Sequence, residues 1–160
     1  MNWRDFVSAT PELATLAERR FEEAGVALLG SLRKDGSPRI SPIEVFVVDG
    51  ELLLGMMWQS RKALDLLRDP RLVIHSASGG KDGTDGDVKL YGRAVDVPQP
   101  ELRRRYGDVL EAGTNWRPPE PYHLFSVDIE SAGYIVFGTE RFALRWSPAT
   151  GLVRIPHPDD

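Results

Sequence analysis

Two tight turns join the first three strand-like runs, and they constrain the fold more than any other feature of the chain. The runs cover residues 26–33, 38–48 and 51–57. Lys34-Asp35-Gly36-Ser37 separates the first two, and Asp49-Gly50 separates the second two; each turn carries the glycine that a positive φ favours. Parallel βαβ winding needs long crossover connections. Neighbouring antiparallel strands are therefore predicted here.

The rest of the chain alternates short helices with further strand-like runs. Apolar residues at helical spacing predict helices from Pro11 to a stop at Gly25, over residues 61–68 and over about 100–111. In the second of these, one apolar stripe is formed by Ala63, Leu64 and Leu67. Further strands are predicted over residues 71–77, 88–97, 123–129, 134–137 and 142–146. About eight short strands with two or three helices indicate a mostly β fold, a small antiparallel barrel with helical additions. The length and the lack of a linker predict one domain, residues 1–160.

The composition excludes several classes of function. The chain has 20 basic and 24 acidic side chains, and its net charge of −4 disfavours a general nucleic-acid or anionic-membrane binder. It has no cysteine, which excludes disulfides, thiol catalysis, thiolate zinc sites and iron–sulfur clusters. The charged N-terminus does not resemble a signal peptide, and no apolar run approaches the ~18 residues of a membrane-spanning helix. We therefore expect a cytoplasmic protein without a membrane or nucleic-acid partner.

The segment Gln59-Ser60-Arg61-Lys62-Ala63 gives the strongest indication of a binding site. Cations in the first turn of a helix oppose its macrodipole, so Arg61 and Lys62 break a local rule. Free N–H groups at the helix start, the Ser60 hydroxyl and two cations together suit a phosphate. Arg39, two elements earlier, is a candidate for a further anion ligand. The alternative interpretation is a pair of solvated cations on a surface helix.

Residues 26–92 resemble the FMN-binding split barrel of pyridoxamine 5′-phosphate oxidase and its relatives. The resemblance rests on the order and spacing of several short motifs. They are Lys34-Asp-Gly-Ser-Pro-Arg39, Val48-Asp-Gly50, Ser60-Arg-Lys-Ala63, Asp69-Pro-Arg71 and Tyr91-Gly-Arg-Ala94. The resemblance implies a split β-barrel of the antiparallel Greek-key type.

The resemblance also implies a set of cofactor-binding residues. Arg61 and Lys62 match the family's basic pair on the FMN phosphate, and Ser60 begins the same motif. Arg39 matches the arginine that opens the strand beside the flavin. The residues that follow it would then flank the ring system: Ile40, Ser41, Pro42 and Ile43. The family's third strand runs past the cofactor, and the residues at that place here are Met56, Met57 and Trp58. Asp87 and Lys89 match the family by their position in the chain alone. The family's site lies at a homodimer interface, and candidates for reaching it from the second subunit are Trp116, Tyr122, Arg145 and Trp146.

Two departures from the family's pattern bear on the substrate. Glu44 stands where oxidases of pyridoxamine 5′-phosphate carry a basic residue, and their C-terminal arginine motif has no convincing match in the last ten residues. The expected function is therefore an FMN-binding oxidoreductase that transfers hydride to or from a different small molecule. A flavin site needs no nucleophile–base pair, because the cofactor carries the redox chemistry.

Two alternatives remain open at this stage. The first is a reductase on the same fold that uses a 5-deazaflavin coenzyme, whose polyanionic tail would suit the basic run Arg103-Arg104-Arg105. The second is a non-enzymatic flavin- or haem-binding protein, in which His75 is the candidate haem ligand. His75, His123 and His157 lack metal-ligand spacing, and the glycine-rich loop with Asp82, Asp85 and Asp87 lacks the pattern of a calcium loop, so no metal-ion site is expected.

Overall fold

The structure, a computed structural model, describes residues 1–77, 80–139 and 141–157. Within these residues nine strands form one antiparallel sheet and four helices pack around it. The strands are β1 (Ala27–Leu32), β2 (Pro38–Ile43), β3 (Phe46–Val48), β4 (Glu51–Met57), β5 (Arg71–Ser76), β6 (Asp87–Asp96), β7 (Tyr122–Val136), β8 (Phe142–Ser147) and β9 (Gly151–Ile155). The helices are α1 (Trp3–Ala9), α2 (Pro11–Ala24), α3 (Arg61–Arg68) and α4 (Pro100–Thr114).

The sheet closes on itself only in part. Its strand order is β2-β1-β5-β6-β7-β4-β3, with β8 paired to β7 and β9 paired to β8. β2 and β3 end this path on opposite sides, yet only residues 44–45 separate them in the chain, so the sheet must curl back and bring its two ends together. No ladder joins β2 to β3 among the described residues, and the barrel is therefore split, as predicted.

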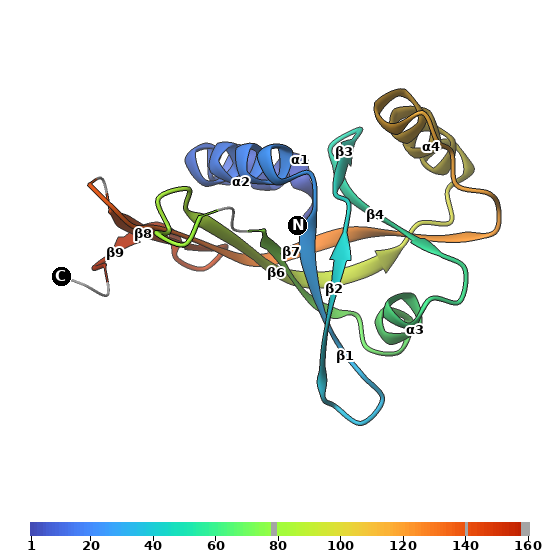
Figure 1. The fold of residues 1–160 in the computed structure, drawn as a ribbon, viewed down its shortest axis with the longest axis horizontal. Coiled ribbons are helices and arrows are strands. Elements are labelled where there is room, and N and C mark those ends of the chain that lie inside the picture. Colours follow the sequence, from blue (N-terminus) through green and yellow to red (C-terminus); the bar gives the residue numbers. More distant parts are fainter. Residues whose placement is uncertain (78–79, 140, 158–160) are drawn as a thin grey trace.

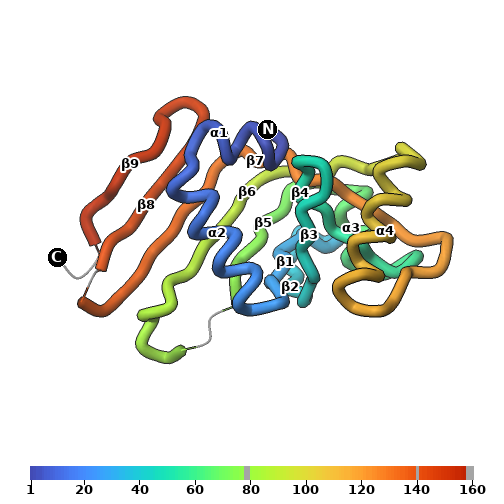
Figure 2. Tube along the Cα trace, turned by 90° about the horizontal axis from the view of Figure 1, so that it is seen from above, coloured from blue at the N-terminus to red at the C-terminus, as the bar shows by residue number. Residues whose placement is uncertain are grey.

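One long strand serves both the barrel and an extension beyond it. β7 pairs with β4 through residues 122–126 and with β8 through residues 132–136. Figure 2 shows β8 and β9 continuing the sheet to one side of the barrel. The sequence predicted two strands in place of β7, because Ser131, Ala132 and Gly133 resemble a break. The structure corrects this prediction, because β7 is one continuous strand. Its pairing with β6 shifts register between Tyr91 and Gly92, opposite Ser131 and Ile129, and this bulge lets the strand continue.

The helices cover different parts of the sheet. α1 and α2 lie on one side of it, over β6 and β7, and α3 lies on the other side beneath the barrel (Figure 1). α1 was not predicted, because its seven residues carry only two buried apolar side chains, Trp3 and Phe6. Its start is capped by Asn2, whose side chain accepts a hydrogen bond of 2.9 Å from the N–H of Asp5. β9 was also missed, since five residues give too short a pattern to recognise.

Two apolar clusters stabilise the fold. The larger fills the barrel and the space beneath α1 and α2, and its fully buried members include Phe6, Leu29, Leu54 and Leu90. Each such side chain contributes roughly 1.5–3 kcal/mol by leaving water. The smaller cluster holds α4 against β3 and β4 through Val48, Leu53, Val97, Tyr106, Leu110, Tyr122 and Leu124. α4 therefore rests on a core of its own and forms a wall beside the end of β4.

The structure splits the second predicted strand as well. Residues 38–48 form β2 and β3, which pair with β1 and β4 respectively, and the chain bends between them. No helix among the described residues is long and apolar enough to cross a membrane.

Candidate functional site

The start of α3 combines a buried hydroxyl with an unpaired cation. The chain turns after β4 through Gln59, whose φ is 58°, and Ser60 is the N-cap residue of α3. The Ser60 side chain caps no N–H group, and its buried Oγ has no hydrogen-bond partner. The exposed Arg61 guanidinium makes no hydrogen bond or ion pair within the described part of the chain. Such a helix start offers free N–H groups and positive potential without a partner for either.

Arg61 and Lys62, the first two residues of α3, line two different cavities. Arg61 borders an open cavity of about 640 Å³ between the β1–β2 hairpin and α3, and the other cations around it are Arg33, Lys34, Arg39 and Arg68. Lys62 borders a second cavity of about 400 Å³. Its Nζ donates a hydrogen bond of 2.7 Å to the carbonyl oxygen of Pro42, which ties α3 to β2. Burial lowers the pKa of Lys62, and the nearby Glu44 carboxylate opposes that shift.

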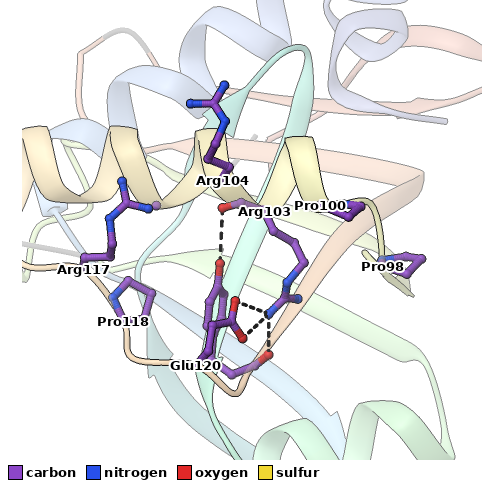
Figure 3. A pocket seen from close by; sticks show the side chains of 9 residues that line it. Pro98, Pro100, Arg103, Arg104, Arg117, Pro118 and Glu120 are labelled. Carbon is purple, nitrogen blue, oxygen red and sulfur yellow. Dashed lines mark hydrogen bonds and ion pairs between the residues drawn. The ribbon is translucent and has the colours of Figure 1, made fainter.

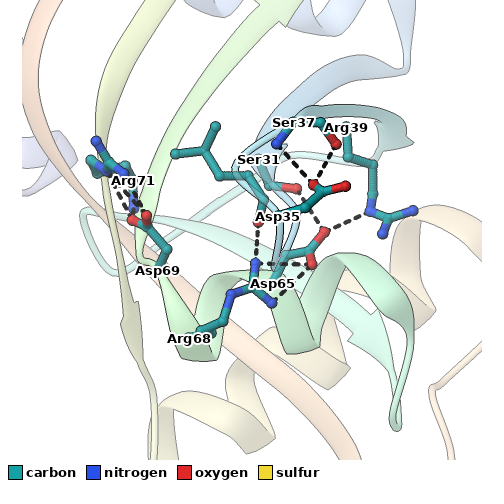
Figure 4. Close-up of polar contacts among 9 residues, drawn as sticks. Ser31, Asp35, Ser37, Arg39, Asp65, Arg68, Asp69 and Arg71 are labelled. Carbon is teal, nitrogen blue, oxygen red and sulfur yellow. Dashed lines mark hydrogen bonds and ion pairs between the residues drawn. The ribbon is translucent and has the colours of Figure 1, made fainter.

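A buried carboxylate holds Arg39 at the edge of the first cavity (Figure 4). Arg39 Nε donates to Asp65 Oδ2 at 2.6 Å, and Arg68 donates to Asp65 Oδ1 at 3.2 Å. Asp65 is only 4% exposed, and the Ser31 hydroxyl lies 3.4 Å from its Oδ2. Burial would raise the pKa of Asp65, but the hydrogen bonds from the two arginines outweigh it and hold the pKa below 3.8. The terminal nitrogens of Arg39 make no hydrogen bond within the described residues, so they remain available to a ligand.

The alternation of β2 separates the residues expected around the flavin ring. Ile40 is 73% exposed and Pro42 is exposed too, so both lie on the outward face. Ser41 pairs with the fully buried Leu29, which places it on the inward face. Ile43 is 5% exposed and belongs to the core, so its side chain lies on the opposite face of β2 from Ile40 and Pro42.

The end of β4 presents one buried and two exposed side chains. Met56 is 4% exposed and borders the second cavity from the core, whereas Met57 is 76% exposed. Trp58 is 53% exposed and stacks on His123, with ring centroids 4.5 Å apart and an interplanar angle of 12°. His123 is buried and its Nε2 has no partner. Met57 and Trp58 are therefore the residues of this strand end that a ligand can cover.

Lys89 does not join the α3 site within one chain. The cross-strand register runs from Pro42 through Leu28 and His75 to Lys89, which places all four on the outward face. Three strand spacings of ~4.8 Å put Lys89 roughly 14 Å from Pro42. Lys89 contacts Asp87, whose Oδ1 also lies 3.6 Å from His75 Nε2, and His75 Nδ1 lies 2.6 Å from the carbonyl oxygen of Ser76.

Of the four residues suspected of reaching the site from a second subunit, two line the second cavity of their own chain. These are Trp116 and Tyr122. Trp146 is 1% exposed and packs edge-on against Phe6 at 5.1 Å, so it belongs to the core. Arg145 is exposed on β8 and has no side-chain partner within the described residues.

Each arginine of the basic run on α4 is paired with a carboxylate, and Figure 3 shows the pair of Arg103 and Glu120. Arg103 pairs with Glu120 at 3.1 Å and lies over the Tyr122 ring, 4.3 Å from its centroid. Arg104 pairs with Glu101 and Asp108, and Arg105 pairs with Asp49 at 2.7 Å. The run therefore offers no surplus of cations to a polyanionic ligand. Among the described residues, no group of three or more histidine or acidic side chains could hold a metal ion.

The second cavity is a feature that the sequence analysis did not identify. Its walls come from the end of β4, from α4 and from the proline-rich segment after α4, and its lining residues are Glu44, Gly55, Met56, Met57, Trp58, Lys62, Tyr106, Leu110, Trp116, Pro118, Pro119, Pro121 and Tyr122. Gly55 leaves room for Tyr106, because a Cβ at Gly55 would come within 2.1 Å of the Tyr106 hydroxyl oxygen. Burial raises the pKa of Tyr106 far above its ordinary value, so its hydroxyl keeps its proton. Trp116 within a proline-rich loop was the one signal in the sequence for this wall.

Similar folds occur in proteins of several kinds. A NimC/NimA family protein from Clostridium acetobutylicum matches with a TM-score of 0.69 and 16% identity, over 86% of this chain and 95% of that one. A haem-binding protein from Mycobacterium smegmatis matches with a TM-score of 0.62 and 18% identity over 80% of this chain, which spans 57% of that protein's length. PhzG from Burkholderia lata, solved with tetrahydrophenazine-1-carboxylic acid, matches with a TM-score of 0.61 and 13% identity, over 96% of this chain and 91% of that one. At these identities the likeness shows the fold alone.

The comparison with protein families is more specific. Curated protein sequences give no significant match. Residues 13–135 match the family described as pyridoxamine 5′-phosphate oxidase, and they include the whole of the α3 site and the end of β4. Because this match covers well over half of the chain, the protein belongs to the pyridoxamine 5′-phosphate oxidase family.

Proposed function

We propose that this protein is an FMN-binding oxidoreductase that acts on a small molecule. The observation that carries the proposal is the unsatisfied polar surface at the start of α3. Within the described residues, the buried Ser60 Oγ has no partner and the Arg61 guanidinium is unpaired. A phosphate would accept hydrogen bonds from both and would interact favourably with the N-terminus of α3. The family of the chain, in which flavin binding is common, supports the same cofactor.

The remaining surface suits the ring system. Ile40 and Met57 are the two most exposed large apolar side chains among those described. Met57 O accepts a hydrogen bond from the Ser60 N–H, and Ile40 lies two residues before Pro42, whose carbonyl oxygen accepts from Lys62. Exposed apolar groups of this kind indicate a surface that a ligand or a partner covers. Lys62 and Arg39 would hold the anionic end, while Trp58 would border the ring. The residues present therefore fit FMN.

The protein's own groups position the cofactor and shield it. Bound FMN supplies the redox chemistry, since its ring accepts or releases hydride. Asp65 fixes the direction of Arg39, and the hydrogen bond from Lys62 to Pro42 holds β2 against α3. The cavity beside Trp58 leaves space for a substrate next to the ring.

A spectrum of the purified protein tests this proposal. We expect flavin absorbance bands to remain after FMN is added and the excess is removed, at about one cofactor per chain. A protein that retains a 5-deazaflavin coenzyme in preference to FMN would contradict the cofactor assigned here, although not the fold. A Soret band on addition of haem, lost in His75→Ala, would favour a haem-binding protein, the function that the similar M. smegmatis protein's name gives. Failure to retain FMN would overturn the proposal.

We also propose a homodimer formed through the outward face of the barrel. The register from Ile40 through Gly30 and Val73 to Tyr91 puts exposed apolar side chains on one face, with Ile40 at 73% and Tyr91 at 45% exposure. Lys89 lies on that same face. In the proposed dimer it would therefore reach the FMN site of the other copy.

Tyr91→Glu is expected to convert the dimer to a monomer, because a buried unpaired carboxylate in the interface costs several kcal/mol. Light scattering would then show half the molar mass. Val109→Glu, which changes a similarly exposed apolar residue on α4, is the control and is expected to leave the mass unchanged. A monomeric wild-type protein would contradict this arrangement.

A further inference from the structure

The cavity beside α4 is built as an aromatic slot. Trp58 follows β4 and Trp116 follows α4; each is about half exposed, and both line the same space of about 400 Å³. Tyr106 and Tyr122 are buried and form its inner wall. His123 stacks against one face of Trp58 and holds the indole in place, which leaves the other face free for a ligand. Aromatic walls of this kind favour a planar ring, which stacks with them.

The charges at this cavity favour a cation over a phosphate. Among its lining residues only Glu44 and Lys62 are charged. In the proposed function the Lys62 ammonium is engaged by the cofactor phosphate, and it also donates to Pro42 O. The exposed Glu44 carboxylate makes no hydrogen bond within the described residues. Arg103 lies over the Tyr122 ring. Its charge is paired with Glu120, and Figure 3 shows this pair. With FMN bound, a dianion in the slot would face Glu44 while Lys62 is held by the cofactor phosphate, whereas a cation would gain both the carboxylate and the indole faces.

We infer that the substrate is a compact planar aromatic compound that carries an ammonium group and no phosphate, with its ring between Trp58 and Trp116 and its cation toward Glu44. The inference rests on the proposed function, because the slot is a substrate site only beside a redox cofactor at α3. The volume lies toward the lower end of the ~300–1,000 Å³ of small-molecule sites, which suits a compact ligand. The protonated Tyr106 hydroxyl adds one hydrogen-bond donor inside the slot.

Three probes that share one ring separate charge from shape. We would measure the binding of 2-naphthylmethylamine, 2-naphthalenemethanol and 2-naphthylmethyl phosphate by calorimetry, with and without FMN. The ammonium is expected to bind about fivefold more tightly than the alcohol, since Glu44 is exposed and its attraction is screened. The phosphate is expected to bind most weakly of the three.

Variants then identify the groups responsible. Glu44→Gln should remove the advantage of the ammonium over the alcohol, whereas Glu130→Gln, a similar change on the exposed side of β7, should leave it intact. Trp116→Ala should weaken all three probes about equally, by about fivefold, because it removes one wall of the slot. Both substituted positions are at least half exposed or on the surface, so the fold is not at risk.

The outcomes distinguish this inference from the proposed function. Tightest binding of the phosphate, or an unchanged order of affinities in Glu44→Gln, would overturn the inference even if FMN is retained. Binding of the ammonium with the expected order in protein that fails to retain FMN would support the slot and overturn the oxidoreductase proposal.

Discussion

Replacing Arg61 and Lys62 together with alanine is expected to weaken FMN binding by at least ~100-fold. Each cation would make a charge-assisted contact with the cofactor phosphate worth about 1.5–3 kcal/mol, and the loss of two contacts at the lower end gives ~3 kcal/mol. The lower end is appropriate because Arg61 is exposed to solvent. Titration of the FMN-free protein with FMN, followed by flavin fluorescence, would measure the change.

A matched double variant controls for the loss of positive charge in general. Arg19→Ala with Arg154→Ala also removes two cations, but Arg154 lies on β9, at the other end of the molecule from α3, and Arg19 lies on α2, on the opposite side of the sheet from α3 (Figure 1). This control should bind FMN as the wild type does at moderate ionic strength, because charges more than a Debye length of ~10 Å away are screened. An equal loss of affinity in both double variants would show that the phosphate is not held at α3.

The part of this site that could be predicted from the sequence is the part that is local in the chain. Arg61 and Lys62 are cations in the first turn of a helix, where they oppose the macrodipole. This conflict can be recognised from residues within one turn of each other. The hairpin turns at Gly36 and Gly50 are local for the same reason, and their φ values of 83° and 85° confirm the predicted left-handed positions. The antiparallel barrel followed from those turns.

The parts that were missed depend on contacts between distant residues. The stripe predicted for α3 included Leu67, which is 51% exposed, whereas the buried face carries Ala63, Leu66 and Asp65. The residues near Asp65 in the chain do not indicate its pairing with Arg39, which lies 26 residues earlier. Arg39 reaches the carboxylate because the β1–β2 hairpin lies beside α3. The aromatic cavity likewise depends on where α4 docks, which helical periodicity does not specify.

The face of β2 was, in contrast, open to prediction. Residues alternate across a strand, so Ile40 and Ile43 cannot lie on the same face. The resemblance to the family placed both beside the cofactor, whereas in the structure Ile40 is exposed and Ile43 is buried in the core. Family resemblance locates a strand near a ligand, and the strand's periodicity then decides which of its side chains can touch it.

Asp65→Asn is expected to destabilise the protein by about 3 kcal/mol, the largest effect on stability that we expect from a single polar substitution. Asp65 is 4% exposed and compensates both Arg39 and Arg68, so the amide would leave two guanidinium groups without their counter-charge. Removal of one partner of a buried ion pair costs ~3–5 kcal/mol, and partial exposure of the arginines places this case at the low end. Urea unfolding followed by tryptophan fluorescence would measure it. Glu101→Gln, which removes an exposed carboxylate paired with Arg104, should give no resolvable change.

The pH dependence of this difference identifies its electrostatic origin. The pKa of Asp65 in the folded protein is lower than in the unfolded chain, so its contribution to stability is fully present above the unfolded value of ~3.9 and is lost as the pH falls through the folded value. The gap in stability between wild type and Asp65→Asn should therefore be constant at neutral pH and narrow below about pH 4. A gap that persists unchanged at pH 3 would mean that Asp65 acts by packing, and that Arg39 is not held in place by its charge.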